Sequence, residues 1–201
     1  MVNNVIVVFG GSFNPPNNSH FSLAEQIVNE YEQVKKILFV PVGDLYEKEG
    51  LLSGEIRYQM LQQICNINSH FDVSDIEIKA EHLLDTIDTL DIIQNQYPDH
   101  DIWFTVGTDN LRQLPHWSKA EELISGFKLL VLERDEDVMD QIIKESSFLK
   151  KYKSSFIRVK ENIRSNSNST FLRQKLRSGK SIRYLVPDEI FFYIEKYQLF
   201  K

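Results

Sequence analysis

The chain has 201 residues, a formal net charge of −6, 42% hydrophobic residues and 26% charged residues. This composition is typical of a globular protein with a core of ordinary size, and the acidic balance argues against broad electrostatic binding to nucleic acid. The single cysteine, Cys65, excludes an internal disulfide and a cysteine-based zinc site. No signal peptide and no apolar run of the ~20 residues that span a membrane are recognisable. We therefore expect a cytoplasmic protein with no membrane partner.

Apolar runs and segments of helical spacing alternate along the chain. Strands are expected at 5–9, 37–42, 71–74, 76–78, 101–106, 127–132 and 156–159. Helices are expected at 21–32, 56–67, 86–97, 137–148, 170–178 and 187–197, with a loop at 43–54. A capping-box pattern at Ser118 predicts one further short helix, and Ser169 is expected to cap the helix after it.

This alternation predicts an α/β protein with a Rossmann-like, doubly wound parallel sheet and helices on both faces. We expect residues 1–201 to form one domain, with a small C-terminal helical part from about residue 165. In such folds ligands bind beyond the carboxyl ends of the strands, where the strand order reverses. A glycine turn after the first strand and Gly107 after a later one both fall at such ends.

Residues 10–20, with the sequence GGSFNPPNNSH, are the most informative segment of the chain. Gly10 and Gly11 let a phosphate approach the backbone closely. The helix that follows offers unpaired N–H groups and the positive end of its dipole. His20, in the first turn of that helix, can donate to a phosphate oxygen. The alternative is that the glycines and prolines merely build a tight turn.

The segment resembles the signature G-G-S/T-F-D-P-x-H-x-G-H of the nucleotidyltransferase superfamily, which includes the nicotinate-nucleotide adenylyltransferases. His20 matches the second histidine of the signature, whereas Asn14, Asn17 and Ser19 replace its aspartate, first histidine and last glycine. The resemblance implies ATP contacts at Gly10, Gly11, Ser12 and Phe13, and catalytic roles for His20 and Asn17. Asparagine can donate a hydrogen bond but brings no charge.

A second segment, Gly107-Thr108-Asp109-Asn110-Leu111, is followed by Pro115-His116-Trp117. It is similar to the G-A/T-D-N-L and P-x-W patterns of the same family. The resemblance implies that Gly107 and Asp109 line an adenosine pocket and that Trp117 stacks on the pyridine ring of a mononucleotide. A tryptophan offers a flat, polarisable face for such stacking. The alternative for Trp117 is that it anchors a loop to the core.

Three further candidate substrate-binding residues follow from the same resemblance. Thr86 would lie near the carboxylate or amide of the pyridine, although the neighbouring Asp85 would repel a carboxylate. Lys48 lies in a loop where the family often has a mononucleotide-binding His-Lys pair, and it is either a phosphate contact or a solvated charge. Arg134 follows a strand, as in family members, and either approaches a ligand or pairs with an acid.

A last segment, Ser167-Asn168-Ser169-Thr170-Phe171-Leu172-Arg173, resembles the family pattern I-S-S-T-x-I/L-R. Hydroxyls of Ser169 and Thr170 at a helix start can bind phosphate beside backbone N–H groups. Arg173, the third catalytic candidate with His20 and Asn17, can add a charge-assisted bond to a triphosphate. Simple helix capping is the alternative and is compatible with phosphate binding.

The resemblance implies attack of a pyridine mononucleotide phosphate on the α-phosphorus of ATP, with release of pyrophosphate. Mg²⁺ would accompany ATP with mostly water ligands, so no dedicated set of protein ligands is expected. Adenylyl or cytidylyl transfer to another phosphorylated acceptor, and a slow or inactive nucleotide-binding relative, stay open as alternatives. The choice between the acid and amide mononucleotides also stays open, and a homo-oligomer is expected from the resemblance alone.

Overall fold

The computed structural model describes residues 4–133, 137–159 and 168–200. Its centre is a six-stranded sheet in the order β3-β2-β1-β4-β5-β6, with every neighbouring pair parallel. The strands are β1 (Asn4–Gly11), β2 (Val34–Pro41), β3 (Phe71–Val73), β4 (His100–Gly107), β5 (Lys128–Leu132) and β6 (Phe156–Arg158). The strand order reverses between β1 and β4, which is the ligand-binding position of a doubly wound fold. The predicted fold class is confirmed.

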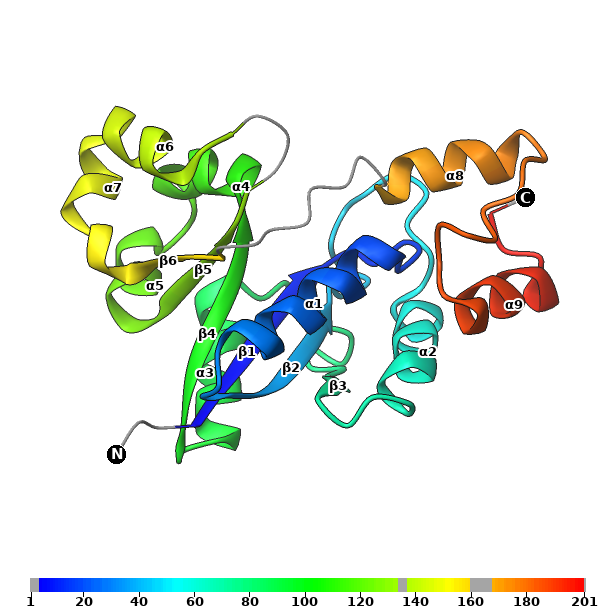
Figure 1. The fold of residues 1–201 in the computed structure, drawn as a ribbon, viewed down its shortest axis with the longest axis horizontal. Helices are drawn as coiled ribbons and strands as arrows, with labels where there is room; N and C mark the ends of the chain where they lie inside the picture. Colours follow the sequence, from blue (N-terminus) through cyan, green and yellow to red (C-terminus); the bar gives the residue numbers. More distant parts are fainter. Residues whose placement is uncertain (1–3, 134–136, 160–167, 201) are drawn as a thin grey trace.

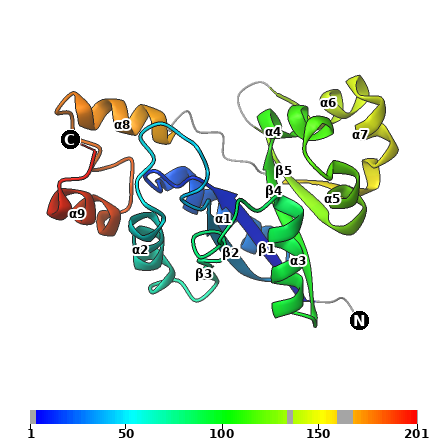
Figure 2. The ribbon, with the colours of Figure 1, turned by 180° about the vertical axis from the view of Figure 1, so that it is seen from behind.

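Helices cover both faces of this sheet (Figures 1 and 2). The α-helices are α1 (Asn18–Glu30), α2 (Gly54–Cys65), α3 (Thr86–Gln96), α4 (Thr108–Gln113), α5 (Ala120–Gly126), α6 (Met139–Glu145), α7 (Ser147–Lys151), α8 (Ser169–Arg177) and α9 (Asp188–Tyr197). Two short 3-10 helices are η1 (Leu114–His116) and η2 (Lys153–Ser155). Among the described residues, no helix has the length and apolar character that crossing a membrane requires.

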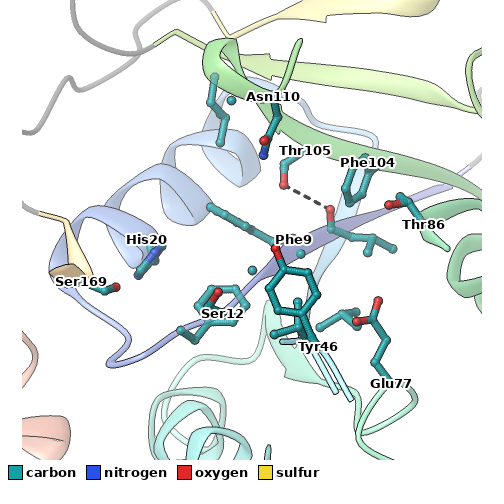
Figure 3. Close-up of a pocket in the computed structure, with 18 of the residues that line it drawn as sticks. Phe9, Ser12, His20, Tyr46, Glu77, Thr86, Phe104, Thr105, Asn110 and Ser169 are labelled. Carbon is teal, nitrogen blue, oxygen red and sulfur yellow. Dashed lines mark hydrogen bonds between the residues drawn. The ribbon is translucent and has the colours of Figure 1, made fainter. Parts of the chain in front are cut away.

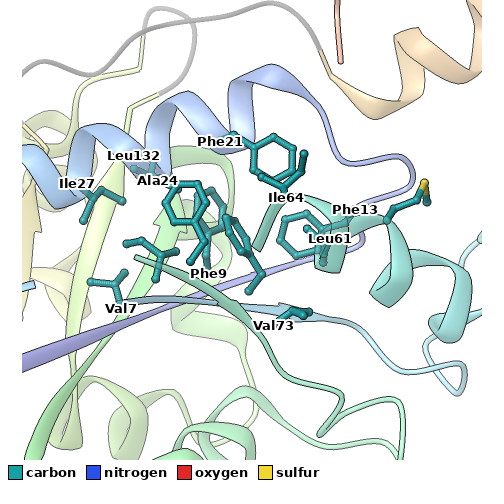
Figure 4. Close-up of a cluster of buried hydrophobic side chains, with 14 of the residues drawn as sticks. Val7, Phe9, Phe13, Phe21, Ala24, Ile27, Leu61, Ile64, Val73 and Leu132 are labelled. Carbon is teal, nitrogen blue, oxygen red and sulfur yellow. The ribbon is translucent and has the colours of Figure 1, made fainter. Parts of the chain in front are cut away.

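Successive residues of the central strands point to opposite faces of the sheet and contribute to two separate hydrophobic cores. Val5, Val7 and Phe9 of β1 pack with α1 and α2, as Figure 4 shows for Val7 and Phe9. Ile6 and Val8 pack on the opposite face with α3, α4, α5 and α6. A strand that is buried on both faces has an unbroken apolar sequence, which is why the run at 5–9 shows no polar alternation. The buried residues of α8 and α9 belong to the α1 side of the sheet.

Two sequence predictions of secondary structure are wrong for local reasons. Residues 76–78 form a turn instead of a strand, held by bonds from Ile76 N–H to Ser74 Oγ (3.3 Å) and from Lys79 N–H to the Asp75 carbonyl (2.9 Å). The helix expected over 137–148 is two helices, because Ser146 has an extended backbone and its hydroxyl caps α7 at Leu149 N–H. A serine that bonds the backbone locally competes with helix continuation.

Two predicted caps are also wrong. Ser118 does not cap α5, because its hydroxyl donates to Asp85 Oδ2 (2.9 Å) and the N-cap residue is Lys119 in a left-handed conformation. Asn168 caps α8, accepting from Phe171 N–H (2.9 Å), so Ser169 is the first helical residue instead of the cap. The Ser169 hydroxyl is thereby available to the β1 turn.

Candidate active site

A cleft of about 980 Å³ opens at the carboxyl ends of β1 and β4. Every predicted site residue within the described ranges lines it: Gly10, Gly11, Ser12, Phe13, Asn17, His20, Lys48, Thr86, Gly107, Asp109, Trp117, Ser169, Thr170 and Arg173. Figure 3 shows His20 and Ser169 on one side of the cleft and Thr86 and Glu77 on the other. Arg134 lies outside the described residues.

The glycine turn is shaped by aromatic rings. A Cβ on Gly10 would lie 3.2 Å from the Phe104 ring, and a Cβ on Gly11 would lie 3.2 Å from the Phe13 ring. The left-handed conformation of the turn falls on Phe13 (φ 46°), which is only 2% exposed. Burial of a large ring offsets the cost of that backbone conformation. A side chain at Gly10 or Gly11 would require the neighbouring ring to shift by a few tenths of an ångström.

Asn17 is the N-cap of α1 and is 1% exposed. Its Oδ1 accepts from Ser19 N–H (3.0 Å) and His20 N–H (3.4 Å), while its own backbone N–H donates to His20 Nδ1 (3.1 Å). An acceptor Nδ1 means that the proton of the neutral imidazole lies on Nε2. The ring of His20 also packs edge-on against Phe13, with ring centroids 5.1 Å apart. Asn17 and Phe13 therefore set both the tautomer and the orientation of His20.

Helix α8 is tied to the β1 turn by side chains that lie 152 to 159 positions away along the chain. Ser169 Oγ donates to the Pro15 carbonyl (2.9 Å), and Asn17 Nδ2 approaches Ser169 Oγ at 3.5 Å. Arg173 donates through Nη1 to the Asn14 carbonyl (2.9 Å) and through Nη2 to Thr170 Oγ1 (3.2 Å). These bonds bring the last of the predicted motif segments to the first.

Positive charge gathers at this end of the cleft. Lys48 Nζ donates to Ser12 Oγ (3.0 Å). Burial lowers the pKa of Lys48, and the positive charges of Arg173 and Arg57 lower it further. Burial and then the charge of Arg177 lower the pKa of Arg173. Cations that repel one another in this way are stabilised by a bound anion.

The opposite end of the cleft is formed by Thr86, at the start of α3, and by Trp117, just after η1. Trp117 also packs on the core of that side, so its anchoring and binding roles are compatible. Asp85, the α3 N-cap, accepts from Ser118 and lies 3.9 Å from Lys119 Nζ. Lys119 bonds Asp88 more closely, at 2.7 Å.

Sequence analysis missed Glu77, a half-buried acid that lines the cleft beside Tyr46 (Figure 3). Burial raises the pKa of the Glu77 carboxyl, although hydrogen bonds from Thr89 and the Gly43 backbone oppose the rise. Thr89 Oγ1 donates to Glu77 Oε1 at 2.9 Å. Glu77 belongs to no motif, and the alternating residues around it predict a strand. It lines the cleft only because residues 76–78 form a turn instead.

Comparison with known proteins agrees with this geometry. A model of the cytidylyltransferase-like family matches residues 8–174. A protein of Caldicellulosiruptor bescii, named as a probable nicotinate-nucleotide adenylyltransferase, is 34% identical over 98% of this chain and 98% of its own. A protein of Clostridium acetobutylicum with the same name is 31% identical over 96% of this chain and 97% of its own.

The chain belongs to the nicotinate-nucleotide adenylyltransferase family. It is therefore a nucleotidyltransferase. A solved structure of Plasmodium falciparum nicotinic acid mononucleotide adenylyltransferase, complexed with NaAD, shares the fold at a TM-score of 0.79 and 21% identity, covering 98% of this chain and 97% of that one. A second structure of that protein, complexed with APC, gives a TM-score of 0.75 at 19% identity, with the same coverage of 98% and 97%.

Within this family the chain departs from the signature at two residues that the structure buries. Asn14 and Asn17 are 0% and 1% exposed, and the side chain of each bonds backbone groups. An asparagine carries both a donor and an acceptor on one side chain. Both departures from this nucleotidyltransferase signature thus have local structural roles.

Proposed function

We propose that this enzyme transfers AMP from ATP to a pyridine mononucleotide, nicotinate or nicotinamide mononucleotide, and releases pyrophosphate, as a step of NAD biosynthesis. One observation carries the proposal: residues of the three motif segments, which are far apart in sequence, line a single cleft together with Lys48 and Thr86. The names of the relatives that match along nearly the whole chain support the same acceptor class.

In the proposed reaction a phosphate oxygen of the mononucleotide attacks the α-phosphorus of ATP. A new P–O bond forms, the bond from the α-phosphorus to the bridging oxygen of the β-phosphate breaks, and pyrophosphate leaves. Phosphoryl chemistry of this kind depends on positioning and on neutralising charge more than on covalent catalysis. The protein's task is therefore to hold two anionic groups in line.

The phosphates would lie at the positive end of the cleft. His20 would donate from Nε2–H to a phosphate oxygen, because Nδ1 is held by the Asn17 N–H. Arg173 would add a charge-assisted bond, and the hydroxyls of Ser169 and Thr170 would add neutral ones. Lys48, which reaches Ser12 Oγ, would neutralise further charge.

The two nucleosides would lie toward the remaining segments. Adenine would lie near Gly107 and Asp109, and the pyridine near Thr86, with its ring on Trp117. Arg134 is proposed as an acceptor contact from its sequence position. Asp85, next to Thr86, would repel the carboxylate of nicotinate mononucleotide, whereas the amide of nicotinamide mononucleotide carries no charge.

Mg²⁺ is the proposed cofactor, with ATP. In the described residues no group of three or more His, Cys, Asp or Glu side chains is arranged to hold a metal ion. Separate carboxylates such as Asp109 and Glu133 line the cleft, which fits an ion that keeps water and takes its main ligands from phosphates. Such an ion would neutralise charge on the transferring phosphoryl group.

We further propose that residues 1–201 act as one nucleotidyltransferase domain, which the shared core of α1, α8 and α9 supports. A homo-oligomer and a cytoplasmic location stay predictions.

Pyrophosphate release with ATP, Mg²⁺ and either nicotinate or nicotinamide mononucleotide tests the function. Release that requires one mononucleotide and falls sharply in His20→Ala is expected, and it also identifies the acceptor. Binding of ATP without release from either mononucleotide would contradict the proposal. Another phosphorylated acceptor or a binding role would then be favoured.

A further inference from the structure

A segment of exposed residues crosses the phosphate end of the cleft and is held from below by two buried polar side chains. We call residues 42–53, between β2 and α2, the strap. Residues 44–50 of the strap are exposed, yet Asn14 and Arg57 beneath it are both 0% exposed. Fully buried polar side chains cost free energy unless they are hydrogen-bonded. The contacts of these two residues therefore indicate what they hold.

Asn14 bonds the strap with both ends of its side-chain amide. Its Nδ2 donates to the Gly50 carbonyl (2.8 Å), and its Oδ1 accepts from Leu52 N–H (3.2 Å). These partners fix the orientation of the amide, because a carbonyl can only accept and a backbone N–H can only donate. An aspartate, which is acceptor-only when ionised, would face the Gly50 carbonyl with a second acceptor.

Asn14 also connects the strap to α8. Its backbone carbonyl accepts from Arg173 Nη1 at 2.9 Å. Asn14 itself is not part of the cleft lining, whereas Arg173 and the strap residue Lys48 both are. The buried residue Asn14 thus joins the strap and α8, the two segments that bring positive charge to the turn after β1.

Arg57 contacts the strap at both ends, at Leu52 beside the Asn14 contacts and at Asp44. Its Nε donates to the Leu52 carbonyl (2.8 Å), its Nη1 donates to the Ser12 carbonyl (3.2 Å), and its Nη2 lies 3.4 Å from Asp44 Oδ1. Between these fastenings, Lys48 Nζ reaches Ser12 Oγ at 3.0 Å. The position of Lys48 therefore depends on contacts made by residues that cannot touch a ligand in the cleft.

We propose that Asn14 is a positioning residue for the transfer reaction. It holds the strap in place against the turn that follows β1, and it thereby positions Lys48. This rests on the proposed function, in which Lys48 contacts a phosphate. The asparagine in place of the signature's aspartate is then a requirement of this strap, since the junction needs a donor as well as an acceptor.

A double-mutant cycle tests the proposal, using Asn14→Asp, Lys48→Met and the combination. A bond to a charged group contributes about 1.5–3 kcal/mol, so each single variant should lower kcat/KM by roughly tenfold or more, mainly through KM. Because both changes remove the same contact, the double variant should fall within about twofold of the worse single one. Multiplying effects, or an Asn14→Asp enzyme with wild-type kcat/KM, would overturn the proposal.

Gln94→Glu is the matched control. Gln94 also donates its side-chain amide to backbone carbonyls, those of Tyr97 (3.3 Å) and His100 (3.0 Å), but it does not line the cleft. The same chemical change there should leave kcat/KM unchanged. If Asn14→Asp fails to fold, Asn14→Ser, whose hydroxyl both donates and accepts but is shorter, enters the same cycle with the same two criteria.

Hydrogen exchange separates this inference from the proposed function. In the protein without substrates, Asn14→Asp should speed amide exchange across the strap about tenfold or more while α9 exchanges as in the wild type. Gln94→Glu should leave the exchange of the strap unchanged. If neither mononucleotide supports turnover, the function fails and this measurement decides the inference alone. Strap exchange that is equal in the wild type and Asn14→Asp would then overturn it.

Discussion

The two ends of the cleft are held together in different ways. At the phosphate end, the side chains of Asn14 and Ser169 bond backbone groups of distant segments, and the buried side chain of Asn17 caps α1. At the opposite end, Asp85 and Lys119 take part in exposed contacts, which contribute little to stability. The end proposed to hold the phosphates of both substrates is thus the rigid one. The end proposed to distinguish the acceptor is free to vary without loss of the fold.

His20→Ala should have the largest effect. It removes a donor aimed at charge that develops during transfer, so kcat should fall about 10²–10³-fold. The melting temperature should also fall, because the His20 ring accepts from Asn17 N–H in the capping box of α1 and packs against Phe13. Steady-state pyrophosphate release measures the effect, and His70→Ala, an exposed histidine outside the cleft, is the control. A kcat within tenfold of the wild type would show that His20 does not stabilise the transition state of the transfer.

Trp117→Ala should weaken the opposite end selectively. Stacking of a base on an aromatic side chain contributes about 1–3 kcal/mol, so the KM of the mononucleotide should rise roughly ten- to a hundredfold while the KM of ATP changes little. Trp117→Phe should restore part of the loss.

Fluorescence gives an independent measurement of the same contact. Trp117 and the buried Trp103 are the two tryptophans of the chain. In Trp103→Phe the remaining emission should be quenched by the mononucleotide. An unchanged KM in Trp117→Ala together with no quenching would mean that Trp117 only anchors its loop.

Variants of Asn17 distinguish a cap from a catalytic donor. If Asn17 acts by capping α1, Asn17→Ser should keep kcat within about threefold, because serine caps comparably. Asn17→Ala should lower the free energy of unfolding by about 1 kcal/mol. Asn17→His should give no large gain in turnover. A fall of 10²-fold or more in Asn17→Ser, with unchanged melting temperature, would instead place the amide of Asn17 on a reacting phosphate.

The sequence predicted which segments meet at the cleft better than it predicted how they contact one another, for a physical reason. Gly10, His20 and Arg173 lie in short motifs whose spacing fixes their local geometry, so their segments could be identified one by one. That Ser169 donates to Pro15, or that Asn14 bonds the strap, depends on how distant segments dock, which no local pattern encodes. Glu77 was missed for the same reason, because the turn that carries it into the cleft depends on tertiary contacts.

Glu77→Gln should have the smallest effect and the clearest pH dependence. Burial raises the pKa of Glu77 above its unfolded value. The unfolded chain therefore releases this proton at a lower pH than the folded chain does, and the stability of the wild type falls as the pH rises from the unfolded pKa to the folded pKa. Glutamine does not titrate, so the variant should gain stability relative to the wild type as the pH rises above the unfolded pKa of Glu77. Thr89→Val removes a hydroxyl that opposes the rise in the pKa of Glu77, so the stability of this variant should fall more steeply with rising pH than that of the wild type. Urea unfolding at several pH values measures both slopes, and parallel curves for all three proteins would show that Glu77 is not perturbed in the folded state.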